Sequence, residues 1–291
     1  MRVERVYDWK AGQGFMELDP NRVDLSVVSP KSIRLAHLSD THLGKEGGAH
    51  RRRELRRWLE LFDGVEARVV VHSGDLVERA DDEEELQAAM ALLEKSRSSI
   101  LGVPGNHDVE RPGQASELVR RWGPFPRREE VAGVRFWLLN SMVSPPVGER
   151  DEGEVEAARE SGFFSRGGLG AEQLDELEQG LGEPWEGPQV VVLHHHLYEM
   201  VPAKPWYAEN SELMGPLGDR RRLLDVVVSG GVDLVLHGHR HQYTIPYSPM
   251  SKMVIVNAGS STPSSPPFRA RVIDMHQGGG AMRIWELVRY G

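Results

Sequence analysis

Seven short apolar runs, each followed directly by polar residues, constrain what this 291-residue chain can fold into. The runs are rich in Val, Ile and Leu and are bounded by Gly, Pro, Asn or His, as buried strands are. They cover residues 33–38, 68–72, 99–103, 134–139, 189–193, 232–236 and 252–256. In layered α/β folds, ligand sites lie at the carboxyl ends of strands, which is where these polar clusters fall.

Helical spacing of apolar residues appears between several of these runs. Residues 51–62, for example, carry Leu55, Trp58, Leu59 and Phe62 at intervals of three and four. Similar spacing occurs in residues 82–95, 169–181 and 213–228. Strands that alternate with helices predict an α/β fold built in layers.

The two ends of the chain are expected to add strands to this core. Within an N-terminal extension, 1–30, residues 23–28 are the candidate for an edge strand. Residues 270–290 are typical of a β-hairpin that turns at three consecutive glycines, 278–280. No repeat and no linker divides the sequence, so we expect one domain over residues 1–291 with its core at about 31–262.

The composition narrows the classes of protein and of site. The chain contains no cysteine, so any metal must be held by His, Asp, Glu or Asn. Hydrophobic residues make up 39% and charged residues 27%, and no apolar run reaches the roughly 18 residues that a membrane helix needs. The polar N-terminus lacks the apolar core of a signal peptide. We therefore expect no membrane partner and a cytoplasmic location.

The net charge bears on the partner. It is −9 at pH 7. Proteins that bind long polyanions usually carry a basic balance, so duplex DNA or RNA is not expected as a partner. A small anionic substrate stays compatible, because bound divalent cations would reverse the local field.

The polar residues that follow the strands are of the types that bind metals. They are Asp40, His42, Asp75, Asn106, His107, Asp108, the triplet His194, His195 and His196, and then His237, His239 and His241. Each motif alone is also a common turn sequence. Their joint occurrence at the ends of five strands favours a metal centre, and oxygen and imidazole ligands suit Mn, Fe or Zn. Two such ions can activate water and clamp the oxygens of a phosphate.

Five sequence blocks carry a resemblance to a known family. They are Asp40-Thr41-His42, Gly74-Asp75, Gly105-Asn106-His107-Asp108, His194-His195 and Gly238-His239-Arg240-His241. In this order and combination, the sequence resembles the calcineurin-like metallophosphoesterases, and within them the bacterial cyclic-nucleotide phosphodiesterase-like branch. The resemblance implies a four-layer α/β fold, in which a central β-sandwich of two mixed sheets is flanked by helices.

The resemblance also implies two divalent ions, of Mn, Fe or Zn, that share one carboxylate ligand. The first ion would be held by Asp40, His42 and His241, the second by Asn106, His194 and His239, and both by Asp75. A hydroxide that bridges the ions would be the nucleophile.

Two further residues would be catalytic by the same resemblance. His107 would lie near the phosphate and stabilise its charge or protonate the leaving oxygen. Asp108 would orient His107 by a hydrogen bond.

One block departs from the family's common pattern of His-His-Pro. Here the strand at 189–193 runs into His194-His195-His196-Leu197. The spacing from the strand favours His194 as the ligand, whereas a shift of one residue would make it His195.

The function that the resemblance implies is metal-dependent hydrolysis of a phosphodiester, such as a cyclic nucleotide or another small phosphodiester. A phosphomonoesterase or a nuclease is the alternative within the family. A catalytically silent scaffold would be expected to lack metal ligands or the catalytic histidine, and both are present here. An oxygenase would use two histidines and one carboxylate around a single iron, fewer ligands than this chain offers.

The aromatic-rich segment 197–214 is either a cap over the substrate or a loop anchored on the core.

Overall fold

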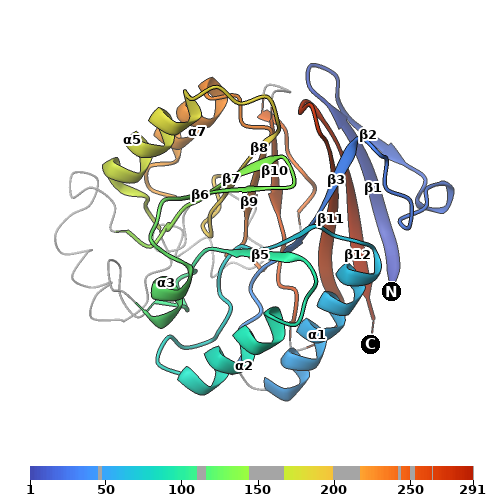
Figure 1. Ribbon diagram of the computed structural model, residues 1–291. Coiled ribbons are helices and arrows are strands. Elements are labelled where there is room, and N and C mark those ends of the chain that lie inside the picture. The colour runs from blue at the N-terminus through green and yellow to red at the C-terminus, as the bar shows by residue number, and fades with distance from the viewer. Residues whose placement is uncertain are drawn as a thin grey trace, which may run out of the picture.

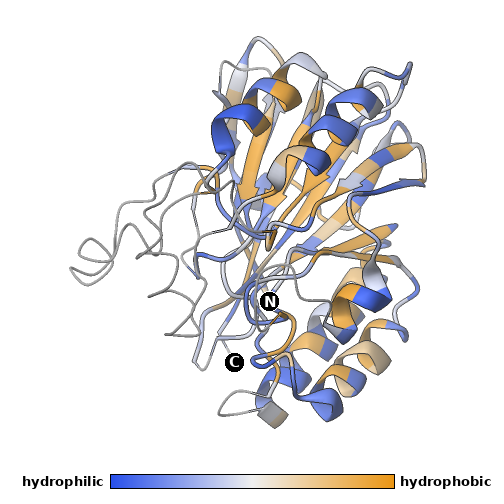
Figure 2. Ribbon diagram, turned by 90° about the vertical axis from the view of Figure 1, so that its left-hand side faces the viewer, coloured by the Kyte–Doolittle hydropathy of each residue, from blue (hydrophilic) through white to orange (hydrophobic). Residues whose placement is uncertain are grey.

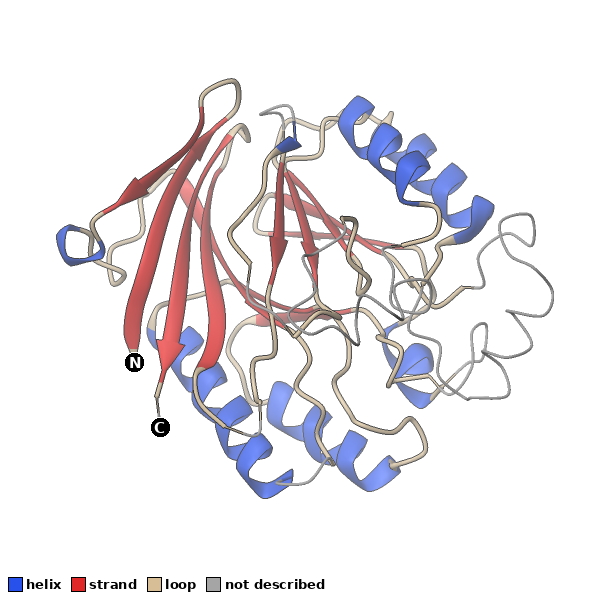
Figure 3. Cartoon of the chain, turned by 180° about the vertical axis from the view of Figure 1, so that it is seen from behind, coloured by secondary structure: helices blue, strands red, loops and turns tan. Residues whose placement is uncertain are grey.

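The computed structural model describes residues 1–44, 48–109, 116–143, 167–198, 217–241, 244–249, 253–263 and 265–290. In these residues two β-sheets pack face to face, and helices cover the outer face of each sheet (Figure 1, Figure 3). The four-layer α/β fold with a central sandwich of two mixed sheets is thereby confirmed.

The larger sheet has seven strands in the order β2-β1-β12-β11-β3-β4-β5. Their bounds are β1 Arg2–Lys10, β2 Gly14–Leu18, β3 Ser32–Leu38, β4 Val69–His72, β5 Ser99–Gly102, β11 Phe268–His276 and β12 Ala281–Arg289. The strands β3, β4 and β5 are parallel, and the other pairs are antiparallel. The hairpin expected at 270–290 is confirmed as β11 and β12.

The smaller sheet has five strands in the order β10-β9-β8-β7-β6. Their bounds are β6 Arg127–Val131, β7 Val134–Leu138, β8 Gln189–Val192, β9 Leu234–His237 and β10 Val254–Asn257. Only β6 runs antiparallel to its neighbour. All seven strands expected from the apolar runs are therefore present, each within two residues of its expected bounds.

The helices form the two outer layers. Their bounds are α1 Gly48–Gly64, α2 Glu83–Leu93, α3 Glu117–Trp122, α5 Gly170–Leu181 and α7 Arg220–Ser229, and η1 Pro20–Arg22 is a short 3₁₀ turn. Side chains of α1 and α2 pack on the seven-stranded sheet, and those of α5 and α7 pack on the five-stranded sheet. Of the helix expected at 213–228, residues 213–216 lie outside the described residues, and the helix begins at Arg220. Within the described residues, none of the helices has both the length and the apolar character to cross a membrane.

Burial on both faces explains why the strand sequences are almost continuously apolar. In β3, Leu35 packs between the two sheets, whereas Ala36 and Leu38 pack under α1 and α2. Figure 2 shows mostly hydrophobic strands, while the helices carry both hydrophilic and hydrophobic residues. Such helices can bury one side against a sheet and leave the other in water.

The edge strand expected at residues 23–28 is wrong, although the N-terminal residues do add strands to the sheet. Residues 23–28 form no strand, and the edge is instead built by β1 and β2, a hairpin whose first strand pairs with β12. The strand β6 was also not expected. These strands lie at or next to sheet edges and carry many charged residues, so apolar runs do not reveal them. Whether the whole chain is one domain stays a prediction.

Candidate metal centre

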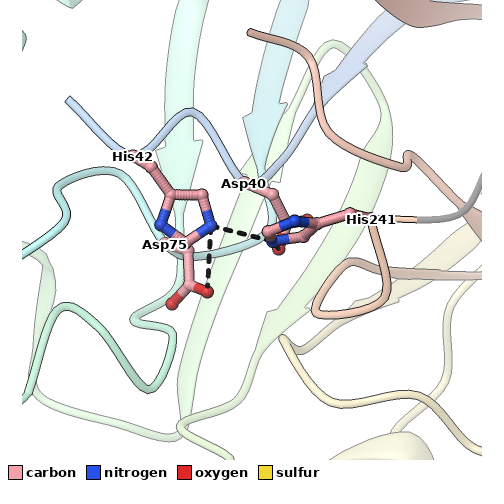
Figure 4. A group of neighbouring side chains, drawn as sticks. All are labelled: Asp40, His42, Asp75 and His241. Carbon is pink, nitrogen blue, oxygen red and sulfur yellow. Dashed lines mark hydrogen bonds and ion pairs between the residues drawn. The ribbon is translucent and has the colours of Figure 1, made fainter. Parts of the chain in front are cut away.

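Four of the expected ligands lie together at the carboxyl ends of β3, β4 and β9. Asp40, His42, Asp75 and His241 each offer one ligand atom, and these atoms lie within 4.8 Å of one another (Figure 4). His42 Nε2 is 2.9 Å from His241 Nε2 and 3.6 Å from Asp75 Oδ2. His241 Nε2 is 3.5 Å from Asp40 Oδ1. The first three residues are buried, and His241 is exposed.

The other three expected ligands form a second group that also contacts Asp75. Asp75 Oδ2 is 3.3 Å from His194 Nε2, which is 3.2 Å from Asn106 Oδ1. His239 Nδ1 is 3.0 Å from the same Asn106 oxygen and 3.3 Å from His194 Nε2. One carboxylate oxygen of Asp75 is therefore close to both groups of side chains. The structure brings all seven expected ligands into one cluster.

Several of these residues adopt a backbone conformation that side chains disfavour. The φ angle is 53° at Asp40, 45° at His42, 55° at Asp75 and 67° at His239. Each such residue costs on the order of 1–3 kcal/mol, and residues of this kind concentrate at functional sites. Hydrogen bonds across the loops oppose the strain, since the His42 N–H donates to the Asp75 carbonyl at 3.0 Å.

Two glycines make the close approach of these loops possible. A Cβ atom at Gly74 would lie 2.4 Å from His194 Nδ1, and one at Gly105 would lie 2.1 Å from Asp75 Oδ1. Neither distance is compatible with a side chain. The two glycines therefore allow a close backbone approach directly after a strand.

The electrostatics of the cluster suit a cation. Both carboxylate oxygens of Asp40 are buried without a hydrogen-bond partner among the described residues. Burial raises the pKa of Asp40 to about 7, against the effect of His194 and with that of the Asp75 charge. Burial lowers the pKa of His194, but the charge and hydrogen bond of Asp75, the charge of Asp40 and the Ser73 carbonyl together raise that pKa to about 9. Both shifts show that the buried carboxylates favour a positive charge beside them.

The donor set also matches a divalent metal. His194 Nδ1 lies 2.8 Å from the Ser73 carbonyl oxygen, so in the neutral ring the Nε2 atom carries the lone pair. That lone pair and the oxygen of Asn106 converge, and two acceptors at this distance need a proton or a cation between them. Imidazole, carboxylate and amide oxygen ligands fit first-row divalent metals. The residues present thus fit the group that the sequence implies.

The structure separates the neighbouring histidines by their contacts. His194 joins the cluster, whereas His195 Nδ1 lies 2.8 Å from Ser141 Oγ. The ring of His196 stacks on that of His239 at 5.6 Å. His37 is buried with its Nε2 atom 2.9 Å from Ser73 Oγ, as a structural histidine would be.

The expected hydrogen bond between Asp108 and His107 is not formed. The Asp108 carboxylate instead accepts hydrogen bonds from the N–H groups of Leu76, Val77 and Gly105 at 3.2, 3.0 and 2.8 Å. The expectation is wrong because a buried carboxylate needs hydrogen-bond donors, and the backbone N–H groups after β4 and β5 supply them. Asp108 joins the loop that carries Asp75 to the loop that carries Asn106.

Glu78 takes the place that was expected for Asp108, and sequence reasoning missed it. The Nδ1 atom of His107 lies 3.0 Å from the Glu78 carbonyl oxygen and 3.8 Å from its carboxylate. The same carboxylate lies 2.8 Å from His42 Nδ1. The available signal was its position three residues after Asp75, in the turn Asp75-Leu76-Val77-Glu78. Carboxylates that contact the far nitrogen of a ligand histidine orient the ring.

The segment 197–214 is described only at its start. Residues 199–214 lie outside the described residues. The ring of Tyr198 contacts that of Tyr247 at 4.9 Å. The choice between a cap and an anchored loop therefore stays open.

Comparisons with known proteins agree with this geometry. The chain is 26% identical over 223 residues to a 3′,5′-cyclic adenosine monophosphate phosphodiesterase, CpdA, of Haemophilus influenzae, over 72% of this chain and 70% of that protein. It is 31% identical over 134 residues to the DNA double-strand break repair protein Mre11 of Haloferax volcanii, over 41% of this chain and 30% of that protein. The fold is similar to that of a dimetal phosphatase from Danio rerio, with a TM-score of 0.60 and 14% identity over 87% of this chain and 98% of the other.

The chain also matches a whole family of proteins. The calcineurin-like phosphoesterase family matches residues 33–243, which include every side chain of the cluster from Asp40 to His241. By this match and by its fold, the chain belongs to the calcineurin-like phosphoesterase family.

Proposed function

We propose that this chain is a phosphodiesterase that works with two divalent metal ions. Asp40, His42 and His241 would hold one ion, Asn106, His194 and His239 would hold the other, and Asp75 would be a ligand of both. The observation that carries the proposal is the place of Asp75, whose Oδ2 atom lies within 3.6 Å of His42 and 3.3 Å of His194. A carboxylate placed between two groups of nitrogen and oxygen ligands is suited to a shared ligand.

The metal ions, when bound, would lower the pKa of a water molecule and neutralise charge on the phosphate. The chain's own residues would place the proton donor. The Glu78 carbonyl fixes the Nδ1 side of His107, and the Glu78 carboxylate complements a positive charge on that ring. His107 would then donate a proton to the leaving oxygen, a role that is typical of a positioned imidazole.

A diester is favoured over a monoester by the similarity to CpdA, which covers 70% of that cyclic-nucleotide phosphodiesterase. A nuclease is the second candidate, because the chain is 31% identical over 134 residues to the repair protein Mre11. The net charge of −9 argues against long duplex DNA, so small or single-stranded substrates come first.

The direct test compares bis(p-nitrophenyl) phosphate with p-nitrophenyl phosphate, using metal-free protein with and without added Mn²⁺. We expect Mn²⁺-dependent cleavage of the diester and little cleavage of the monoester, followed by cleavage of a cyclic nucleotide. Preference for the monoester would replace the proposal with a phosphatase. Binding of two ions without cleavage of either substrate would favour a catalytically silent scaffold protein instead.

A further inference from the structure

A segment far along the chain, Ser260 to Thr262, forms hydrogen bonds with the backbone of the loop that carries Asp40. The Ser260 hydroxyl donates to the Asp40 carbonyl at 2.9 Å, and the Thr262 hydroxyl donates to the Thr41 carbonyl at 2.5 Å. Between them, the Ser261 N–H donates to the Ser39 carbonyl at 3.0 Å, and the Ser261 hydroxyl accepts the Ser39 N–H at 3.2 Å. These three residues, which we call the hydroxyl clamp, are all buried.

The hydroxyl clamp is itself held by α1. The Arg51 guanidinium donates to the carbonyls of Thr262 at 2.6 Å and Thr41 at 3.3 Å. The Trp58 indole N–H donates to the Ser261 carbonyl at 2.9 Å. The clamp therefore connects a rigid helix to the loop after β3, so its position is well defined.

The loop that accepts these hydrogen bonds has a disfavoured backbone conformation. Asp40 and His42 both have positive φ angles, of 53° and 45°, and Thr41 lies between them. A loop in this conformation relaxes unless the surrounding structure determines it. Because the clamp bonds the carbonyls of Asp40 and Thr41, it sets the orientation of the two peptide planes that direct the Asp40 and His42 side chains.

We propose that Ser260 and Thr262 are positioning residues that preorganise Asp40 and His42 for one metal ion of the pair. This inference rests on the proposed two-metal function. It also makes a selective claim, since none of the hydrogen bonds found among the described residues joins the clamp to Asn106, His194 or His239. Loss of the clamp should weaken the binding of one of the two ions and leave the binding of the other unchanged.

The test is calorimetric titration of metal-free protein with Mn²⁺, for the parent and for the double variant Ser260→Ala/Thr262→Val. Valine keeps the shape of threonine and removes the donor. We expect one of two Mn²⁺ affinities to fall by about 10–100-fold, which is typical when a group that orients a ligand is lost. The other affinity should stay at the parent value.

Two controls separate positioning from a general loss of stability. Ser98 also donates a buried hydroxyl to a carbonyl, that of Ala67 at 2.7 Å, but at the amino end of β5, away from the metal centre. The Ser98→Ala variant should lower the melting temperature of metal-free protein yet bind both ions as the parent does. Thr262→Ser, which keeps the hydroxyl, should also bind as the parent does. If the double variant does not fold, Thr262→Val alone is titrated.

The outcomes distinguish the clamp from the proposed function. A double variant that binds both ions with parental affinity, or loses both equally, overturns the clamp while the parent's diester cleavage still supports the phosphodiesterase. A parent that binds no Mn²⁺ overturns both ideas before any variant is made.

Discussion

At the scale of single residues, the metal centre depends on side chains whose contacts are not interchangeable. Asp75 Oδ2 lies close to both groups of ligands, whereas the ring of His107 lies beside that of His42, with ring centroids 4.6 Å apart. Replacing these two residues should therefore separate metal binding from proton transfer.

Asp75→Asn should remove at least one bound ion per chain and abolish diester cleavage, because it removes the negative charge shared by both groups. Metal content by elemental analysis and turnover with bis(p-nitrophenyl) phosphate are the measurements. A variant that keeps both ions and its activity would contradict the place of Asp75 in the proposal.

His107→Ala should lower turnover by about 10²–10⁴-fold, the usual contribution of a positioned acid or base, while both ions stay bound. Elemental analysis of the same sample checks the second half of the expectation. Loss of ions from this variant would mean that His107 is a ligand and not the proton donor.

Glu78→Gln should lower turnover and Mn²⁺ affinity by about 10-fold, because the amide no longer complements positive charge on His107 or orients His42 as strongly. Glu84→Gln, an exposed position in the first turn of α2, is the matched control and should leave both quantities unchanged. Equal effects of the two substitutions would remove the case for Glu78.

At the scale of elements, the short parallel strands carry polar residues into the core at their carboxyl ends. His72, the last residue of β4, is fully buried, with its Nε2 atom 3.1 Å from Thr41 Oγ1. Burial lowers its pKa from the usual 6.5 to about 3. The neutral ring is therefore part of the folded state, and its protonation is linked to unfolding.

This linkage gives a pH dependence with a definite sign. Between about pH 6.5 and pH 3 the unfolded chain binds a proton at His72 that the folded chain does not, so stability falls as the pH falls through this window. Chemical unfolding of the parent and of His72→Gln should differ in slope by about 1.4 kcal/mol per pH unit. Identical slopes would show that the ring is protonated in the fold.

At the scale of the whole molecule, the N-terminal extension is part of the sandwich. Trp9 on β1 is buried between the sheets, and its indole N–H donates to Ser248 Oγ at 3.0 Å. The first strand of the chain thus contacts a segment almost 240 residues away. Its contribution should be to stability and not to catalysis.

Trp9→Ala should lower the free energy of unfolding by about 3–5 kcal/mol, the cost of a large cavity in a core. Met16→Ala on β2, where the side chain is 59% exposed, should change it by less than about 0.5 kcal/mol. Diester turnover of both folded variants should match that of the parent. A small effect at Trp9 would show that the extension folds against the core only loosely.

The sequence by itself determined the family and the seven core strands, because both depend on short patterns along the chain. A buried strand on a covered sheet must be apolar throughout, and a close backbone approach directly after it needs a glycine. These constraints are local, so a single sequence displays them.

Only the tertiary structure decided which groups meet across the site. It placed His194 and not His195 beside Asp75, exchanged Asp108 for Glu78 as the partner of His107, and brought Ser260 to Thr262 under the Asp40 loop. It also replaced the expected strand at 23–28 with β1 and β2. Such contacts join residues separated by tens to hundreds of positions, and edge strands need not be apolar on their exposed side. The physical reason is that they depend on distances and directions in space, which spacing along the chain does not encode.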